Sequence, residues 1–481
     1  MMDKKKILLA LIIFSGFFLR SYSLFLPTLS DSGIYAYLAY EVYNGKKPYV
    51  DFFMPAPPLD IYLISLSYRI FGVSIASSML PTVFFSCLSI PLVYVAAKKF
   101  YGDDAALLAT FAFSLEPNII AYTSNNFLTS EPLFFSLLAS YLYLSGLGGK
   151  SRCLFFAGLS AGLATMGKYL GLMVFVSMVI HTLLIRKSLK SILVVSSGFL
   201  SVILLFMFLF LSQEMIDQTA VYYLLREGFP IEAKLTVVLP SIFGFYALTA
   251  MLFFMGLGNL IGLNIWKDHD KYFTINILVA ILSILAINNN HFFMYGVYFS
   301  ISVYAMVLLG CRTLDYVNKP MFLLLLFLFL GFTAVSDIRI MTCNSLVSTT
   351  LAEDIEGAKE YILANTDENS KLLVIDYPLH YIPLLTKRQI VAKGIDLDTY
   401  RLDFDLDDEG INSMKEEASF ILHLDFENNP EVNRLLKRED ELNDRFGVST
   451  DAAKIRNKIL LEETTKVYES GPVRIHSVDP Q

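Results

Sequence analysis

Repeated apolar runs, each about 20 residues long, constrain the fold of this chain more than any other feature of its sequence. A run of this length can cross the hydrocarbon core of a bilayer as one α-helix. With a hydrophobic fraction of 55% and a mean hydropathy of +0.53, the runs exclude a soluble globular protein. About eleven membrane spans are predicted, over residues 7–26, 75–97, 105–122, 132–147, 153–167, 169–185, 191–212, 236–265, 273–288, 292–310 and 320–336.

The charged residues divide the chain into a membrane part and an acidic tail. From Asp337 onward there are 29 acidic and 17 basic residues, a net charge of −12, whereas the 16 acidic and 21 basic residues before it give +5. We therefore predict a transmembrane domain over residues 1–336 and a soluble domain over residues 337–481. The acidic tail argues against nucleic acid as a partner, because phosphate binding needs clustered Lys and Arg.

Basic residues fall on alternate connections between the predicted spans, beginning with Lys4–Lys6 and Lys98-Lys99. By the positive-inside rule these connections and the N-terminus are cytoplasmic in a multi-pass cell-membrane protein. The loop of residues 27–74 and the C-terminal domain then face outward. The apolar run after MMDKKK continues to Leu26, which indicates an uncleaved signal anchor.

The first outer loop, residues 27–74, is polar, aromatic and interrupted by proline. An amphipathic helix is predicted from Gly33 to Tyr43, and its tyrosines, including Tyr35, suit the membrane interface. Prolines around Pro57 break the chain before a second amphipathic segment, residues 59–71. Sequence alone leaves two interpretations open: an interfacial loop without chemistry, or a catalytic loop.

The tail is predicted to be a small α/β domain, so the expected fold is a mainly helical transmembrane bundle with a C-terminal extracytoplasmic α/β domain. No glycine-rich phosphate loop opens any of its helices. The acidic run of residues 403–409 is interpreted as a solvated face. Helices are expected at residues 352–364, 430–437 and 452–463, and strands at residues 371–377, 419–426 and 473–478.

Six charged or ionisable residues lie at the predicted outer ends of helices and are candidates for chemistry. Each also has a structural explanation, such as a helix cap, a first-turn acid or an interfacial lysine. A carboxylate can take a proton from an acceptor hydroxyl, while a cation can stabilise the phosphate of a departing lipid carrier. The six are Asp31, Asp51, Glu131, Lys168, Arg226 and His291.

The order of several short motifs resembles the GT-C class of polyprenyl-phosphate-sugar-dependent transferases. These motifs are SDSGIYAYLAYEVYNG, PYVDFFMPAPPLDIYLISLSYRIFG, TSEPLFFSLLAS, GLATMGKYLGL and NHFFMYGVYFS. The pattern is most similar to the protein O-mannosyltransferase and lipid A aminoarabinose-transferase group, and it extends over about residues 7–310. The resemblance implies a GT-C-like bundle and a donor that is carried on a polyprenyl phosphate.

The resemblance also implies roles for individual residues. Asp31 is expected to act as the catalytic acid or base, Glu131 as the second outer carboxylate, and Lys168 and His291 as contacts to the lipid phosphate or the sugar. Tyr35, Asp51, Pro57 and Arg226 complete the expected substrate-binding set.

This chain departs from the group at two positions. Many relatives carry an Asp-Glu pair where Asp31 is followed by Ser32, and a Lys or His where Ala56 precedes Pro-Pro. The second departure removes a phosphate ligand. Either another cation, Lys168, Lys46, Lys47 or Arg226, replaces it, or the activity is altered or lost.

We therefore expect an integral membrane glycosyltransferase that transfers a hexosyl or pentosyl group to a hydroxyl of a protein, lipid or glycan acceptor. No cofactor is predicted; Asp31 and Glu131 leave room for a shared divalent ion, although no His or Cys spacing supports one. The alternatives are a secondary transporter or lipid flippase, which predicts broken helices and internal repeats, and a non-catalytic scaffold with an outer binding domain.

Overall fold

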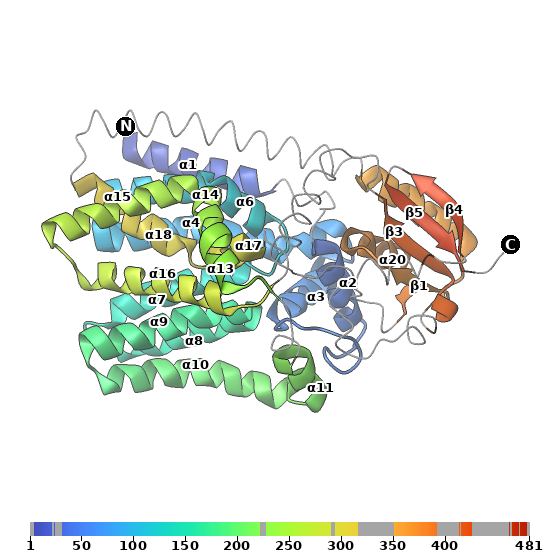
Figure 1. Ribbon diagram of the computed structural model, residues 1–481, viewed down its shortest axis with the longest axis horizontal. Coiled ribbons are helices and arrows are strands. Elements are labelled where there is room, and N and C mark those ends of the chain that lie inside the picture. The colour runs from blue at the N-terminus through green and yellow to red at the C-terminus, as the bar shows by residue number, and fades with distance from the viewer. Residues whose placement is uncertain are drawn as a thin grey trace.

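The computed structural model places a helical bundle beside a small β-sheet, with helices α2 and α3 between them (Figure 1). It describes residues 4–21, 24, 31–221, 228–289, 294–315, 351–391, 413, 415–425, 461, 464–470 and 472–478. The helices of the bundle run along its long axis. The short helices α2 and α3 cover the end of the bundle that faces the sheet.

Most predicted spans correspond to helices whose ends lie within a few residues of the prediction. The helices are α1 (Lys4–Ser21), α4 (Ile75–Tyr101), α5 (Asp103–Leu115), α6 (Pro117–Ser124), α7 (Ser130–Gly146), α8 (Ser151–Gly167), α9 (Leu172–His181), α10 (Leu189–Phe210), α11 (Gln213–Ile216), α13 (Ile231–Ala233), α14 (Leu239–Phe245), α15 (Ala247–Leu263), α16 (Asp268–Ala286), α17 (Met294–Ser300) and α18 (Val303–Gly310).

Three predicted spans are broken rather than continuous. The predicted span 105–122 bends by 59° between α5 and α6, the span 236–265 lies in a pair bent by 99°, and the span 292–310 bends by 58°. By length and composition, four helices among the described residues can cross a membrane, or seven if each bent pair is one span. The predicted span 320–336 lies outside the described residues.

A buried acid joins two of these bends. Pro117 is the first residue of α6 and has no amide hydrogen to continue the hydrogen bonding of α5, so the chain turns at Glu116. The Glu116 carboxylate, only 2% exposed, accepts hydrogen bonds from the amide of Thr249 at 3.2 Å and from its hydroxyl at 2.6 Å. It thereby satisfies a free amide in the first turn of α15.

Helices α8 and α10 pack closely because glycine lies on both sides of their contact. A Cβ at Gly158 would lie 1.9 Å from the carbonyl oxygen of Val195, and a Cβ at Gly198 would lie 2.0 Å from that of Phe155. Small residues allow helix backbones to approach in a membrane, where lipid competes for apolar contacts. The other side of α10 carries exposed apolar residues, such as Phe208 at 86%, as expected for contact with lipid.

The outer loop folds as α2 (Ser32–Tyr43) and α3 (Leu59–Phe71), as predicted. The chain between them is held by Gln218, whose amide nitrogen donates to the Tyr49 carbonyl at 2.7 Å and whose amide oxygen accepts from the Met54 amide at 2.8 Å. The Tyr49 hydroxyl donates to the Ala56 carbonyl at 2.9 Å. These contacts fix the proline segment that precedes α3.

The C-terminal part contains a five-stranded mixed sheet in the order β2-β1-β3-β5-β4. Strand β1 is parallel to β2 and β3, whereas β5 is antiparallel to β3 and β4. The three predicted strands are present as β1, β3 and β5. The predicted segments 430–437 and 403–409, and nearly all of 452–463, lie outside the described residues. The strands are β1 (Lys371–Val374), β2 (Gln389–Ile390), β3 (Phe420–Leu424), β4 (Thr465–Ser470) and β5 (Val473–Ser477), with helix 351–365 before them and α20 (Tyr381–Thr386) between β1 and β2.

One hydrophobic core joins this sheet to α2 and α3. Ile34 and Ile61 from the outer loop and Leu372 and Ile475 from the sheet belong to the same buried cluster. The amide of Ile390 donates to the Tyr37 hydroxyl at 3.0 Å, and both residues are buried. The sheet is therefore packed directly on the loop that carries Asp31.

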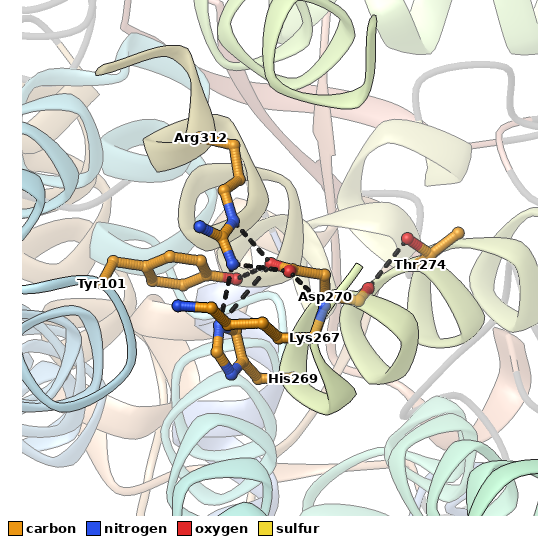
Figure 2. Close-up of polar contacts among 6 residues, drawn as sticks. All are labelled: Tyr101, Lys267, His269, Asp270, Thr274 and Arg312. Carbon is orange, nitrogen blue, oxygen red and sulfur yellow. Dashed lines mark hydrogen bonds and ion pairs between the residues drawn. The ribbon is translucent and has the colours of Figure 1, made fainter. Parts of the chain in front are cut away.

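The opposite end of the bundle is held by a buried ion pair (Figure 2). Arg312 donates to both carboxylate oxygens of Asp270, from Nε at 3.1 Å and from Nη2 at 2.7 Å. The Tyr101 hydroxyl donates to Asp270 Oδ1 at 3.0 Å, and the Lys267 amide donates to Oδ2 at 2.9 Å. Asp270 is fully buried, so these four hydrogen bonds replace its hydration and connect α4, α16 and the segment after α18.

Replacing Asp270 with Asn should lower the free energy of unfolding by about 3–5 kcal/mol, because Arg312 is left buried without a counter-charge. Thermal and denaturant unfolding of the purified protein in detergent measure the change. Asp268→Asn is the matched control: its pair with Arg186 is partly exposed, and its loss should cost less than about 1 kcal/mol. Equal losses in the two variants would contradict the assignment.

Candidate active site

Four charged side chains come from four different elements at the end of the bundle nearest the sheet. Asp31 directly precedes α2, and Asp60 is the second residue of α3. Glu131 is the second residue of α7, and Lys168 directly follows α8. Three acids thus lie at helix N-termini, where the helix dipole favours negative charge.

A close contact between α7 and α8 brings Glu131 and Lys168 together. A Cβ at Gly167 would lie 2.8 Å from Cγ of Pro132, so the end of α8 meets the start of α7 without an intervening side chain. Lys168 then extends to the loop before α7, where its Nζ donates to the Phe127 carbonyl at 2.7 Å. Its Nζ also lies 5.1 Å from the centre of the Tyr298 ring, within the range of a cation–π contact.

Asp60 and Glu131 form a buried pair of carboxyl groups that lie next to each other. Asp60 Oδ2 accepts a hydrogen bond from Asn126 Nδ2 at 3.0 Å. Asp60 Oδ1 and both Glu131 oxygens have no other side chain as a hydrogen-bond donor among the described residues, and the two carboxyl groups lie within hydrogen-bonding reach of each other. Burial raises the pKa of Asp60 to about 6, opposed by the Asn126 donor and by the Lys168 charge. Two carboxylates this close favour the sharing of a proton.

Lys168 supplies the positive charge of the cluster. Burial lowers the pKa of Lys168 to about 8, and the negative charges of Asp31 and then Asp60 oppose this shift. The ammonium group therefore stays mostly protonated at neutral pH while most of its hydration is lost. Such a cation interacts more strongly with a phosphate than an exposed lysine does.

The structure brings together the three residues that the sequence placed first, Asp31, Glu131 and Lys168. Asp31 is half-buried and acts electrostatically on Lys168. Asp60 was not predicted as a site residue. In the sequence, Asp60 is visible as an acid in the first turn of the helix that begins in the PPLDIY segment. An acid at that position often only stabilises the helix dipole, so sequence alone does not mark it as a site residue.

The remaining predicted residues lie elsewhere or outside the description. Asp51 is exposed, and its Oδ2 accepts from the Lys47 amide at 2.6 Å within a turn. Tyr35 is half-buried on α2, and Pro57 is buried in the segment before α3. Arg226 and His291 are outside the described residues.

No group of three or more His, Cys, Asp or Glu side chains in the described part of the chain is arranged to hold a metal ion. Asp31, Asp60 and Glu131 are acids at one site without such a geometry. The cluster is suited to proton transfer and to phosphate binding, because it combines a half-buried carboxylate with a cation.

The chain is similar in fold to solved glycosyltransferases and matches a mannosyltransferase family model over part of its length, which agrees with the resemblance seen in the sequence. The protein-family model described as dolichyl-phosphate-mannose-protein mannosyltransferase matches residues 55–216, about a third of the chain. That range includes Asp60, Glu131 and Lys168, but not Asp31.

Among individual proteins, the chain is similar in fold to ArnT from Cupriavidus metallidurans. The structure of ArnT without ligand superimposes with a TM-score of 0.68 at 13% identity and covers 99% of this chain and 98% of ArnT. ArnT bound to undecaprenyl phosphate gives a TM-score of 0.66 at 12% identity, over 99% of both chains.

Two further similarities are more distant. The oligosaccharyltransferase AglB from Archaeoglobus fulgidus, in complex with an inhibitory peptide and a dolichol-phosphate, gives a TM-score of 0.53 at 12% identity over 87% of this chain and 69% of AglB. The Bacillus subtilis protein named "Putative mannosyltransferase YkcB" is 28% identical over 156 residues. That match spans 29% of this chain and 21% of YkcB.

Replacing Asp60 with Asn should stabilise the protein at neutral pH. Because the pKa of Asp60 is raised from 3.8 to about 6, the folded state loses stability relative to the unfolded state as pH rises between these values. Asn keeps an acceptor oxygen for Asn126 and has no charge to bury. The free energy of unfolding should increase by up to about 3 kcal/mol at pH 8 and be unchanged near pH 4.

Thermal unfolding of the two proteins between pH 4.5 and 8 measures this difference. A melting temperature for Asp60→Asn below that of the unsubstituted protein at pH 8 would contradict it.

Proposed function

We propose that this chain is an integral membrane glycosyltransferase that transfers a sugar from a polyprenyl-phosphate carrier to an acceptor hydroxyl on the outer face of the cell membrane. The observation that carries the proposal is the meeting of Asp31, Asp60, Glu131 and Lys168 at one end of a GT-C bundle. The N-terminus is cytoplasmic in this proposal, and the C-terminal domain is extracytoplasmic.

The proposed reaction is a displacement at the anomeric carbon of the donor sugar. Asp31 takes the proton of the acceptor hydroxyl while the acceptor oxygen forms a bond to that carbon. The bond between the anomeric carbon and the phosphate oxygen breaks, and the phosphate leaves with the electron pair. Lys168 stabilises the negative charge that develops on the phosphate, and Glu131 orients the acceptor or the sugar.

The comparisons support the donor class more than the acceptor. ArnT binds undecaprenyl phosphate and AglB binds a dolichol-phosphate in structures of the same fold class. Nucleotide-activated sugars are made in the cytoplasm, so an outward-facing site needs a sugar that is already carried on a lipid. Assays with a panel of donors and acceptors would identify whether a hexosyl or pentosyl group is transferred. They would also identify whether the acceptor is a protein, a lipid or a glycan.

One observation favours a second candidate function, a transporter or lipid flippase. That alternative predicts broken membrane helices, and three bent helix pairs are present. The bends are linked by hydrogen bonds such as that between Glu116 and Thr249, and they occur in a bundle that aligns with ArnT over 99% of both chains. We therefore place the transferase first.

Asp31→Asn should reduce transfer at least about 100-fold, because Asn cannot accept the proton of the acceptor hydroxyl. The measurement is sugar transfer from a panel of radiolabelled polyprenyl-phosphate sugars in membranes that contain the chain, with and without a chelator. Asp104→Asn, an exposed acid at the other end of the bundle, is the control and should retain full activity. Full transfer by Asp31→Asn would refute the role of Asp31 as the general base. No transfer from any donor by the unsubstituted chain would refute the proposal that the chain is a glycosyltransferase.

Lys168→Met should reduce kcat by about 100- to 1,000-fold, because the cation that stabilises the leaving phosphate is lost. Lys168→Arg should recover part of the rate and change its pH dependence. The activity of the unsubstituted protein should decline above pH 8 as Lys168 loses its proton, whereas a guanidinium group stays charged. Rates measured between pH 6 and 10 test this. The same decline in rate above pH 8 for the unsubstituted protein and for Lys168→Arg would contradict the role of Lys168 as the cation that stabilises the phosphate.

A further inference from the structure

We infer that Asn126 is a positioning residue of the candidate active site, which fixes Asp60 and the start of α2 relative to Lys168. The inference rests on the proposed function and adds to it a residue that takes no part in the reaction itself. Asn126 lies in the short loop between α6 and α7 and is 1% exposed.

Every polar group of the Asn126 side chain and its own amide make a hydrogen bond. The amide donates to Ser32 Oγ at 3.0 Å, and Nδ2 donates to Asp60 Oδ2, also at 3.0 Å. Oδ1 accepts from the Leu128 amide at 3.2 Å, which closes the loop on itself. Ser32 follows Asp31 in the chain, so Asn126 connects the start of α2, next to Asp31, and Asp60 of α3 to a single point.

The next residue of the loop holds the cation. The Phe127 carbonyl accepts from Lys168 Nζ at 2.7 Å. Two consecutive residues therefore bind three segments that are 94, 66 and 41 positions away in the sequence. The loop thus adds hydrogen bonds that help to fix Asp31, Asp60 and Lys168 relative to one another, beside the direct packing of α2 on α3, where the Tyr68 hydroxyl donates to the Ala36 carbonyl at 3.0 Å.

The loop is built to keep one conformation. Leu128 has a φ of +54° and is 1% exposed, an unusual backbone conformation for a branched apolar residue. Such a conformation costs about 1 kcal/mol or more and persists only where the surroundings enforce it. Here the hydroxyls of Thr129 and Ser130 donate to the Tyr122 and Thr123 carbonyls at 2.5 and 2.8 Å and tie the loop to α6.

A loop that only supports the fold would also be buried and hydrogen-bonded, so the test must change charge without changing shape. Asn126→Asp is nearly isosteric and replaces the Nδ2 donor with an acidic oxygen 3.0 Å from Asp60 Oδ2. The new carboxyl group and Asp60 repel each other when both are ionised. At lower pH a proton between them restores one hydrogen bond.

The expected result is a pH-dependent loss of activity. At pH 8, kcat of Asn126→Asp should fall at least about tenfold, with KM for the donor within about twofold, because the acids are displaced while the phosphate-binding Lys168 is kept. The ratio of variant to unsubstituted kcat should rise as pH falls to 6. Asn126→Ala removes the donor without adding charge, so its ratio should be reduced and independent of pH.

Asn125→Asp is the matched control. Its side chain donates to the Ala121 carbonyl at 2.9 Å, at the end of α6, whereas the hydrogen bond to Asp60 comes from Asn126. Its kcat ratio should stay near one at every pH. A pH-independent ratio for Asn126→Asp, or the same ratio as for Asn125→Asp, would overturn the inference.

A second measurement keeps this test separate from that of the proposed function. Inactivity of the unsubstituted protein toward every donor would refute the glycosyltransferase. The melting temperatures of the two aspartate variants then decide the inference. The melting temperature of Asn126→Asp should fall increasingly below that of Asn125→Asp as pH rises from 5 to 8, and parallel curves would overturn the contact.

Discussion

Charge that is buried at the edge of a membrane has to be balanced inside the protein, and this requirement organises the outer end of the bundle. Asp60 and Glu131 are fully buried, and the groups that stabilise a charge on Asp60 come from other elements: the side-chain amide of Asn126 and the ammonium of Lys168. A buried carboxylate without such partners would cost several kcal/mol. The charges proposed for catalysis therefore also link α2, α3, α7 and α8 at this end of the bundle.

The apolar side of the outer loop provides the complementary constraint. Asp31 precedes α2, and six residues later Tyr37 accepts a hydrogen bond from Ile390 at the edge of the sheet. Because an α-helix rises about 1.5 Å per residue, Asp31 and Tyr37 lie about 9 Å apart along the axis of α2. From the C-terminal domain, the buried Tyr381 hydroxyl lies next to the hydroxyls of Ser32 and Ser78. The loop is thus fixed between the bundle and the sheet, so the sheet helps to position the segment that carries Asp31.

Hydropathy, proline and basic residues were sufficient to predict the main architecture. They predicted most of the helices and their ends, the helices α2 and α3, and three of the five strands, because each of these follows from a local pattern. They did not predict the bends. Pro117 precedes one bend, and Pro240 and Gly244 precede the bend at Tyr246, but these residues alone do not fix where the chain turns. The hydrogen bond that caps Thr249 comes from Glu116, 133 residues away.

The site shows the same division between local and distant information. Asp31, Glu131 and Lys168 were identifiable because ionisable residues are rare at the ends of apolar runs. Asp60 and Asn126 were missed because both belong to ordinary polar segments, and only the packing of α3 against the loop after α6 makes them neighbours. No local pattern encodes a contact over 66 positions.

The sequence differs from the GT-C group at Ser32 and Ala56, and in both cases another residue supplies the charge that relatives carry at that position. Ser32 stands where relatives carry a second acid, and here its hydroxyl accepts the Asn126 amide, while Asp60 supplies a carboxylate from α3. Ala56 stands where relatives carry a cation, and it is buried with its carbonyl bound by Tyr49.

Of the cations proposed to replace it, Lys46 is paired with Glu41 and Lys47 is exposed, whereas Lys168 lies beside Asp31 and Asp60. An acid for the acceptor and a cation for the phosphate are thus both present in the described part of the chain, although they come from different helices. The electrostatic field at the reacting atoms depends on where the charges are held and not on which element holds them. The placement of these charges, together with a fold similar to that of ArnT, supports the proposal that the departures altered the substrate more than the type of reaction.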